Sequence, residues 1–116
     1  MSNDRGYLIA HMDDVAAVQS TCGTSRRAFI SPDNRAASIH LLDLRADVEA
    51  HYHKDITEIY YILEGEGALE LNGEDVPVRP GTAVLIKPGT FHRGKGRMRL
   101  LVICVPPFDK KDEWFE

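Results

Sequence analysis

The sequence predicts an all-β fold, a sandwich or a barrel, and three observations lead to that prediction. From residue 28 onward, short runs of β-branched, aromatic and alternating apolar residues follow one another closely. Gly and Pro separate these runs, as they separate the strands of sandwiches and barrels. Helical signal is thin, because the segment from Asp13 to Val18 fits either one turn capped by Asp13 or an extended arm.

The expected strands are residues 38–44, 58–63, 67–71, 74–78, 82–86 and 99–105. Asn72-Gly73 lies between two of them, and this pair is favoured at the central positions of a type I′ hairpin turn. Gly65 is expected to end the strand that Glu58 begins. Pro77 has no N–H to donate, so it is expected at a sheet edge or at a position that needs no hydrogen bond.

The 116 residues fit one domain, which is large enough to fold without a disulfide or a structural metal. Residues 1–27 are expected to form an N-terminal arm, residues 28–107 the barrel and residues 108–116 a C-terminal tail. The tail carries three aromatic side chains, which are expected to dock on the barrel rather than extend into solvent.

Composition excludes several kinds of partner. The formal net charge of -4 leaves no broad basic surface for nucleic acid. No apolar run reaches the length of a membrane span, and the acidic N-terminus lacks the apolar core of a secretory signal. Cys22 and Cys104 stand far apart in no CxxC pattern, so two free thiols are expected. These features predict a cytoplasmic protein with no nucleic-acid or membrane partner.

Three histidines and one glutamate form the most informative pattern in the chain. His51 and His53 are two residues apart, so on a strand both side chains point to the same side. Glu58 and His92 can complete a ring of three imidazoles and one carboxylate around a divalent transition metal. The alternative is a pair of exposed or hydrogen-bonded strand histidines, because a His-x-His pair alone is a weak signal. All four residues fall near ends of predicted strands, where side chains can converge on the mouth of a barrel.

Two longer motifs contain these residues. HYHKDITEIYYILEG resembles the first cupin motif, whose positions are matched by His51, His53, Glu58 and Gly65. GTAVLIKPGTFH resembles the second cupin motif, whose positions are matched by Gly81, Gly89 and His92. The chain is therefore similar to small single-domain cupins, the RmlC-like proteins with a conserved barrel. The resemblance covers residues 45–92 directly and extends loosely over most of the chain.

Some positions depart from the usual motifs. Arg45 stands where the first motif opens with Gly, and Gly96 stands where the second motif usually has Asn. Lys87 occupies the usual position of Pro, which is shifted here to Pro88. None of these positions supplies a metal ligand in the family, so differences are expected in turn geometry rather than in the ligands.

The resemblance implies a double-stranded β-helix, or jelly-roll, barrel that binds one divalent metal through His51, His53, Glu58 and His92. Imidazole and carboxylate ligands suit iron, manganese, zinc or nickel, and the ligand set does not choose among them. Four protein ligands leave open positions on an octahedral ion for substrate or water. Small cupins often dimerise, and the apolar arm Tyr7–Ala10 is suited to add as a strand to the partner of a homodimer.

Other residues are candidates for the pocket. Tyr60 lies on the face of Glu58 if the strand is regular, either as an acid or base or as a core tyrosine. Arg93, in the cationic run of residues 93–99, and Arg27, beside Arg26, are candidates for binding an anionic group of the substrate. The alternative for both segments is a solvated charged face. The two histidines outside the motifs, His11 and His40, are expected to be surface or hydrogen-bonded residues.

Two classes of function fit this pattern. The first is a metal-dependent enzyme, of dioxygenase, isomerase or lyase type, which acts on a small polar or acidic metabolite. The second is a non-catalytic cupin that binds a sugar or small acid, with a metal that mainly stabilises the barrel. Metal identity separates them in part, since iron favours oxygenase chemistry while zinc or nickel weakens that interpretation. The fold hosts many reactions, so the sequence leaves the substrate open.

Overall fold

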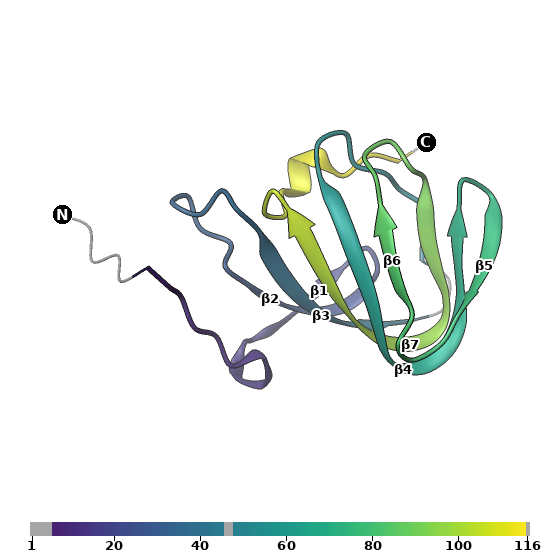
Figure 1. Cartoon of the computed structure of the whole chain (residues 1–116), viewed down its shortest axis with the longest axis horizontal. Coiled ribbons are helices and arrows are strands. Elements are labelled where there is room, and N and C mark those ends of the chain that lie inside the picture. The colour runs from purple at the N-terminus through teal and green to yellow at the C-terminus, as the bar shows by residue number, and fades with distance from the viewer. Residues whose placement is uncertain (1–5, 46–47, 116) are drawn as a thin grey trace.

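The all-β prediction is confirmed. A computed structural model of the chain describes residues 6–45 and 48–115, and in these residues seven strands form one antiparallel sheet that closes as a jelly-roll barrel (Figure 1). The strands are β1 Ala17–Ser20, β2 Gly23–Ala28, β3 Ser38–Leu44, β4 Thr57–Leu71, β5 Glu74–Val78, β6 Ala83–Ile86 and β7 His92–Val105. Two 3-10 turns, η1 Met12–Asp14 and η2 Lys110–Asp112, flank them. In the described ranges, no helix has the length and apolar character needed to cross a bilayer.

The two longest strands, β4 and β7, pair along their whole length and bend together. The sheet order is β1-β2-β3-β7-β4-β5, and β6 pairs with the first half of β4. Figure 1 shows both strands turning at the lower edge of the view, so that the two ends of each strand rise to the same side. The start of β4 and the start of β7 are therefore brought to one end of the barrel, although they are far apart along the ladder.

Glycines permit this bend, and here one expectation was wrong. Gly65 does not end a strand, because β4 continues through it with a register shift between Ile62 and Glu64. Gly65 follows this shift and pairs with Met98, and its φ of +85° is a value that glycine adopts at little cost. Gly67 pairs with Gly96, and a Cβ on Gly67 would collide with the backbone carbonyl of Lys95. The two backbones approach too closely at the bend for larger residues.

The expected hairpin is confirmed at Asn72-Gly73. Both residues have positive φ, 49° and 84°, as a type I′ turn requires. The turn joins β4 to β5, and β5 pairs with β4 alone, so Pro77 lies on an edge strand as predicted. The last strand is longer than expected, because β7 begins at His92 rather than at Arg99.

The N-terminal region contributes more to the sheet than the predicted arm of residues 1–27 implies. Residues 17–28 form a hairpin of β1 and β2, and β2 pairs with β3 along its whole length. Of the two alternatives for the segment after residue 13, a turn capped by Asp13 is not formed, since η1 begins after His11 and no side chain caps it. The extended segment before η1 projects from the barrel in Figure 1, with Tyr7, Leu8 and Ile9 exposed. Residues 1–5 of the predicted arm lie outside the described residues.

Cross-strand register arranges part of the barrel interior in three rows. The outer row is polar and consists of Glu58, Cys104 and Ser38. The second row has mixed polarity and consists of Tyr60, Val102, His40 and Arg27. The third row is mostly apolar and consists of Ile62, Leu100, Leu42 and Ser25. The interior thus changes from polar at the mouth to apolar below, where the buried aliphatic side chains form the core.

A pair of glycine substitutions tests the role of the bend. Gly65→Ala is expected to lower the free energy of unfolding by about 3 kcal/mol, because it adds a clash to the cost of positive φ. The clash is with the backbone carbonyl of Arg97, which cannot move without disturbing the ladder. Gly81 also has positive φ, 92°, but open space around its Cβ position, so Gly81→Ala is expected to cost only about 1–2 kcal/mol. Urea denaturation measures both values, and equal losses would contradict the steric explanation.

Candidate metal centre and its pocket

Backbone hydrogen bonds join the two motifs that carry the histidines. His51 and His92 exchange both of their backbone hydrogen bonds, at N–O distances of 3.1 and 2.9 Å, and this places the two rings 4.4 Å apart. The backbone carbonyl of His53 accepts from the backbone N–H of Gly89 at 2.7 Å. The His51–His53 segment forms only isolated bridges, but its two histidines still point into the same space.

The four residues predicted as ligands converge at the mouth of the barrel. One potential ligand atom from each of His51, His53, Glu58 and His92 lies within 4.8 Å of all the others, and all four residues are buried. Glu58 Oε1 lies 3.2 Å from His53 Nε2 and 3.0 Å from His92 Nε2. The bend in β4 and β7 makes these short distances possible. His92 is the first residue of β7 and Glu58 is the second residue of β4, and the bend brings the starts of the two strands together.

The hydrogen bonds of the three histidine rings show which ring nitrogen of each can bind a cation. Each ring places Nδ1 against a backbone carbonyl: His51 against Glu49, His53 against Asp112 and His92 against Thr90, at 3.3, 2.8 and 2.9 Å. A carbonyl only accepts, so Nδ1 carries the proton of the neutral ring and Nε2 presents a lone pair. In the described part of the chain, His53 Nε2, His92 Nε2 and Glu58 Oε1 are buried without a hydrogen-bond partner of good geometry. A cation between them satisfies all three, and the donor set fits a divalent transition metal.

Burial and close contacts shift the pKa values of three of these four residues. Burial raises the pKa of the Glu58 carboxyl, but the imidazoles of His53 and His92 outweigh it and hold the pKa well below its usual range. For His53, burial lowers the pKa, while the nearby Glu58 carboxylate produces a net increase. Burial and the neighbouring His92 lower the pKa of His51 to about 4.

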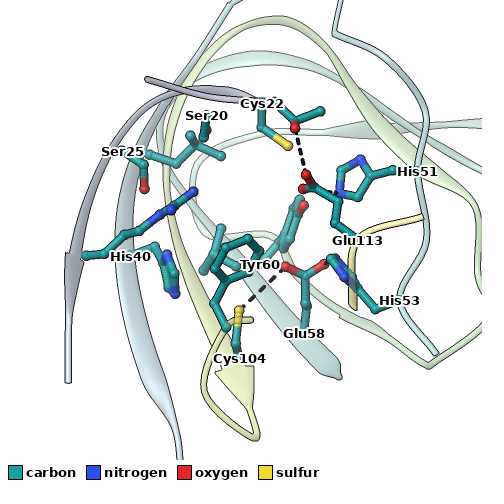
Figure 2. Close-up of a pocket in the computed structure, with 15 residues that line it drawn as sticks. Ser20, Cys22, Ser25, His40, His51, His53, Glu58, Tyr60, Cys104 and Glu113 are labelled. Carbon is teal, nitrogen blue, oxygen red and sulfur yellow. Dashed lines mark hydrogen bonds and ion pairs between the residues drawn. The ribbon is translucent and has the colours of Figure 1, made fainter. Parts of the chain in front are cut away.

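A small cavity of about 40 Å³ lies beside this cluster, with space for a few water molecules. Its walls come from the interior rows, from the turn between β1 and β2, and from the C-terminal tail. Figure 2 shows His51, Glu113, His53 and Glu58 on one side of the cavity, with His40 and Ser25 on the other. Candidate ligands and the second row of the interior thus face the same space.

Tyr60 and Arg27 both line this cavity, at the second row of the interior. Tyr60 is buried, with its ring 6.0 Å from that of His92. Burial and the nearby Glu58 raise the pKa of Tyr60 well above its usual value, so the phenol keeps its proton. The Arg27 guanidinium lies 4.5 Å from the centre of the Phe108 ring, and its Nε is buried without a hydrogen-bond partner among the described residues.

Arg93, the other candidate for binding an anionic group, lies outside this cavity. Its side chain pairs with Glu70 at 3.1 Å, opposite in the ladder between β4 and β7, and it does not line the cavity. Strand alternation turns Arg93 to the outside, because its neighbour His92 points inward. Arg26 turns outward for the same reason and donates to the backbone carbonyls of Asp13 and Val15.

Glu58 is the only carboxylate of the two motifs among the residues that line the cavity, but the tail supplies a second one. Glu113 lines the cavity, and its Oε2 lies 3.8 Å from His51 Nε2. The hydroxyl of Thr21, in the turn between β1 and β2, donates to Glu113 Oε1 at 2.8 Å and so holds the carboxylate in place. No spacing rule links Glu113 to either motif, so sequence reasoning treated it as part of a docking tail. Only the fold brings residues 21 and 113 together.

His40 was also missed as a residue of the cavity. It is buried, lines the cavity and contacts the Ser38 hydroxyl at 2.8 Å, while its ring packs edge-on against Phe108. Burial, together with the Arg27 guanidinium, lowers the pKa of His40 to about 4, so the ring is neutral. Alternation along β3 was the available signal, because Ser38 and His40 share a face with the core residue Leu42.

Both cysteines are free thiols, as predicted. Cys104 lies in the outer row, where its Sγ is 3.6 Å from Glu58 Oε2. Burial raises the pKa of the Cys22 thiol to about 12, and nearby carboxylates of Glu58 and Glu113 contribute. Neither thiol is activated as a nucleophile, because burial and neighbouring negative charge raise the pKa of both.

Comparison with known proteins agrees with this geometry. Residues 40–105 match the family model of the cupin domain, a range that holds both motifs and all four clustered residues. The chain belongs to the cupin family. This cupin is 30% identical over 117 residues to L-ectoine synthase of Desulfatibacillum aliphaticivorans, a match that covers 91% of this chain and 90% of that protein.

Solved structures share the whole barrel. A protein from Planctomyces limnophilus superposes with a TM-score of 0.88 at 31% identity, covering 96% of this cupin and 98% of that chain. Pac13, described as a nucleoside dehydratase, superposes with a TM-score of 0.80 over 95% of this cupin and 94% of its own chain. Identity to Pac13 is 17%, so that likeness concerns the fold alone.

The shifted pKa of His40 predicts how stability depends on pH. The unfolded ring ionises near 6.5 and the folded ring near 4, so the unfolded state binds more protons between these values. The contribution of His40 to the free energy of unfolding is therefore fully present above the pKa of the unfolded ring. It decreases as the pH falls toward the pKa of the folded ring. His40 is expected to account for a loss of about 2 kcal/mol between about pH 7 and about pH 5.

The variant His40→Gln is expected to lack this part of the loss, because glutamine does not titrate. Urea denaturation at the two pH values measures it. His11→Gln serves as the control, since His11 is exposed and outside the cavity. A loss in His40→Gln as large as in the unsubstituted protein would refute the assignment.

Proposed function

We propose that this cupin is a metal-dependent enzyme that acts on a small polar or acidic metabolite by lyase chemistry, the elimination of water or a related proton transfer. One observation carries the proposal: the buried cluster of three imidazoles and a carboxylate shares a cavity with a protonated phenol and a second carboxylate. Elimination needs a group that accepts a proton and a group that donates one, close to an electrophile. The relatives named a synthase and a dehydratase are compatible with this class.

His51, His53, Glu58 and His92 would hold the metal, through the three Nε2 atoms and a Glu58 oxygen. When bound, a divalent metal would act there as a Lewis acid that polarises an oxygen of the substrate. The choice among iron, manganese, zinc and nickel is open in this proposal. Histidines that bind a metal through one ring nitrogen commonly donate a hydrogen bond from the other nitrogen to a carbonyl oxygen. All three histidines have such a contact here.

Glu113 and Tyr60 are the proposed proton-transfer groups. The Glu113 carboxylate accepts a proton from the substrate, while its other oxygen stays bonded to the Thr21 hydroxyl. The Tyr60 hydroxyl donates a hydrogen bond, and then a proton, to the departing hydroxyl group, which leaves as water. The two residues return to their first states by proton exchange with solvent, so substrate and products balance.

Arg27 is the proposed binding residue for an anionic group of the substrate. It shares the second interior row with Tyr60, and in the described ranges no carboxylate forms an ion pair with it. Its stack on Phe108 fixes the guanidinium plane, which favours two parallel hydrogen bonds to a carboxylate. Once the cavity opens, a substrate with a carboxylate at one end and a leaving hydroxyl at the other would lie between Arg27 and the metal cluster.

The size of the cavity favours a second candidate, a non-catalytic cupin in which a metal mainly stabilises the barrel. A volume of about 40 Å³ is far below that of a typical metabolite site, so a substrate needs the β1–β2 turn or the tail to shift. Metal binding is common to both candidates, and turnover is not. Oxygenase chemistry is the further alternative within the enzyme class, and iron as the native metal would favour it.

We further infer a homodimer in the cytoplasm. Tyr7, Leu8 and Ile9 are 61%, 65% and 73% exposed, an apolar segment that a second copy could cover, as light scattering can test. The free state of Cys22 and Cys104 supports a reducing compartment.

Removing one proposed ligand tests metal binding. His92→Ala is expected to reduce the metal content of the purified protein at least tenfold, because three ligands hold the ion less tightly than four. Bound metal is expected to stabilise the unsubstituted protein by about 3 kcal/mol at a hundredfold excess over Kd, and His92→Ala to lack this gain. Elemental analysis and thermal melts with and without metal measure the two effects. His11→Ala is the control, and unchanged metal content in His92→Ala would contradict the assignment.

Turnover separates the two candidates. The protein loaded in turn with iron, manganese, zinc or nickel is expected to eliminate water from a member of a panel of small hydroxy acids, followed by mass spectrometry. Glu113→Gln and Tyr60→Phe are expected to lower kcat by roughly 100-fold or more, with metal content preserved. Tyr52→Phe is the control, because Tyr52 packs on Phe91 and does not line the cavity. Metal binding with no turnover of the panel would favour the non-catalytic candidate.

A further inference from the structure

We propose that Asp112 is a positioning residue of the metal centre, through which the C-terminal tail holds His53 and Glu58 in place. The inference rests on the metal binding proposed above for the cluster. The tail residues 109–115 cross the mouth of the barrel beside the loop that precedes β4, as Figure 1 shows. Asp112 contacts that loop through both its side chain and its backbone.

The Asp112 carboxylate binds the loop that links two proposed ligands. Its Oδ1 accepts from the backbone N–H of Lys54 at 2.9 Å. Its Oδ2 accepts from the backbone N–H groups of Asp55 and Ile56 at 3.0 and 3.1 Å. Residues 54–56 lie directly between His53 and the start of β4, where Glu58 is the second residue. Three charge-assisted bonds therefore fix the connection between the two ligands.

The backbone of Asp112 fixes one of those ligands directly. Its carbonyl accepts from Nδ1 of His53 at 2.8 Å. This bond sets the ring tautomer and turns Nε2 toward Glu58 Oε1. A single residue of the tail thus controls the ring orientation of His53 and the loop that leads to Glu58.

Trp114 keeps the tail in this position. Its backbone exchanges two hydrogen bonds with Tyr52, both at 2.9 Å, beside the two ligand histidines of the first motif. Its indole N–H donates to Asp112 Oδ1 at 3.1 Å, and the Lys54 ammonium lies 3.6 Å from the ring centroid. Trp114 therefore anchors the tail next to Asp112. This holds the Asp112 carboxylate within hydrogen-bond distance of the backbone N–H groups of residues 54–56.

Asparagine is the informative substitution at this position. In Asp112→Asn the side chain keeps one acceptor oxygen, but its new NH₂ group faces backbone N–H donors of the loop, where no acceptor remains. The loop bonds are thus weakened while the size of the side chain is preserved. Groups that orient metal ligands typically change metal affinity by about 10- to 100-fold when removed.

The test compares metal affinity among variants. Zn²⁺ and Co²⁺ affinities are measured by chelator competition at one pH, and the Co²⁺ absorption spectrum reports the ligand geometry. Asp112→Asn and Asp112→Ala are expected to bind both ions roughly 10- to 100-fold more weakly, with an altered Co²⁺ spectrum. Asp109→Asn is the matched control, because the Asp109 carboxylate bonds to Lys111 within the tail rather than to the loop. Its affinity and spectrum are expected to equal those of the unsubstituted protein.

The outcomes separate this inference from the proposed function. Asp112→Asn with unchanged affinity and spectrum, in a protein that binds metal tightly, overturns the positioning role alone. An equal loss in Asp109→Asn also overturns it, since the effect would then not be specific to the loop bonds. An unsubstituted protein that binds neither ion overturns both proposals. If the Asp112 variants do not fold, Trp114→Phe, which removes the indole donor, is expected to weaken binding several-fold, and no change there counts against the role.

Discussion

The bend shared by β4 and β7 is the constraint on which the rest of the structure depends. These strands pair along their whole length, yet their starts lie at opposite ends of the ladder. Only a ribbon that turns back on itself brings His92 to 3.0 Å from Glu58. Gly65 and the Gly67–Gly96 pair allow that turn, because the backbones approach where a Cβ would collide. The same glycines that shape the barrel therefore create the mouth at which polar side chains converge.

The convergence of acceptors at this mouth has an electrostatic cost in the metal-free chain. Three imidazole nitrogens and a carboxylate oxygen face one another in a buried site, and a proton or a metal ion is needed between them. The backbone exchange between His51 and His92, and the carbonyls behind the three rings, hold this arrangement against relaxation. The barrel thus stabilises a set of side chains that would otherwise separate, which is the usual relation between a fold and a site built on it.

Sequence reasoning was successful where the signal is local. The Asn72-Gly73 turn, the edge strand with Pro77 and the four clustered residues all follow from spacing and turn chemistry. It was wrong at the bend: Gly65 was expected to end a strand, but β4 continues through it just after a register shift between Ile62 and Glu64. Periodicity gave no strand for β1 and β2, because β1 is an exposed edge strand and the inner face of β2 places Ser25 and Arg27 in a polar cavity.

The site could be predicted only in part for a related reason. The ligand candidates lie in two motifs of fixed spacing, whereas Glu113 and Asp112 reach the cavity and the loop from the far end of the chain. Arg27 and Arg93 had the same local signal, a place in a cationic run. Strand alternation and register then turned Arg27 into the cavity and Arg93 toward Glu70. Such choices depend on pairing across strands, which a single sequence without structure does not specify.

The rows of the barrel interior have a consequence for how this protein can change. Hydrogen bonds between backbone groups hold the strands together. The side chains of the second interior row do not take part in them. Exchanges at His40 or Arg27, which lie outside the core cluster, are therefore expected to change the lining of the cavity while the strand register remains the same. The barrel is in this sense a scaffold whose lining can vary. This separation of support from chemistry offers a physical reason why barrels of one shape host unrelated reactions.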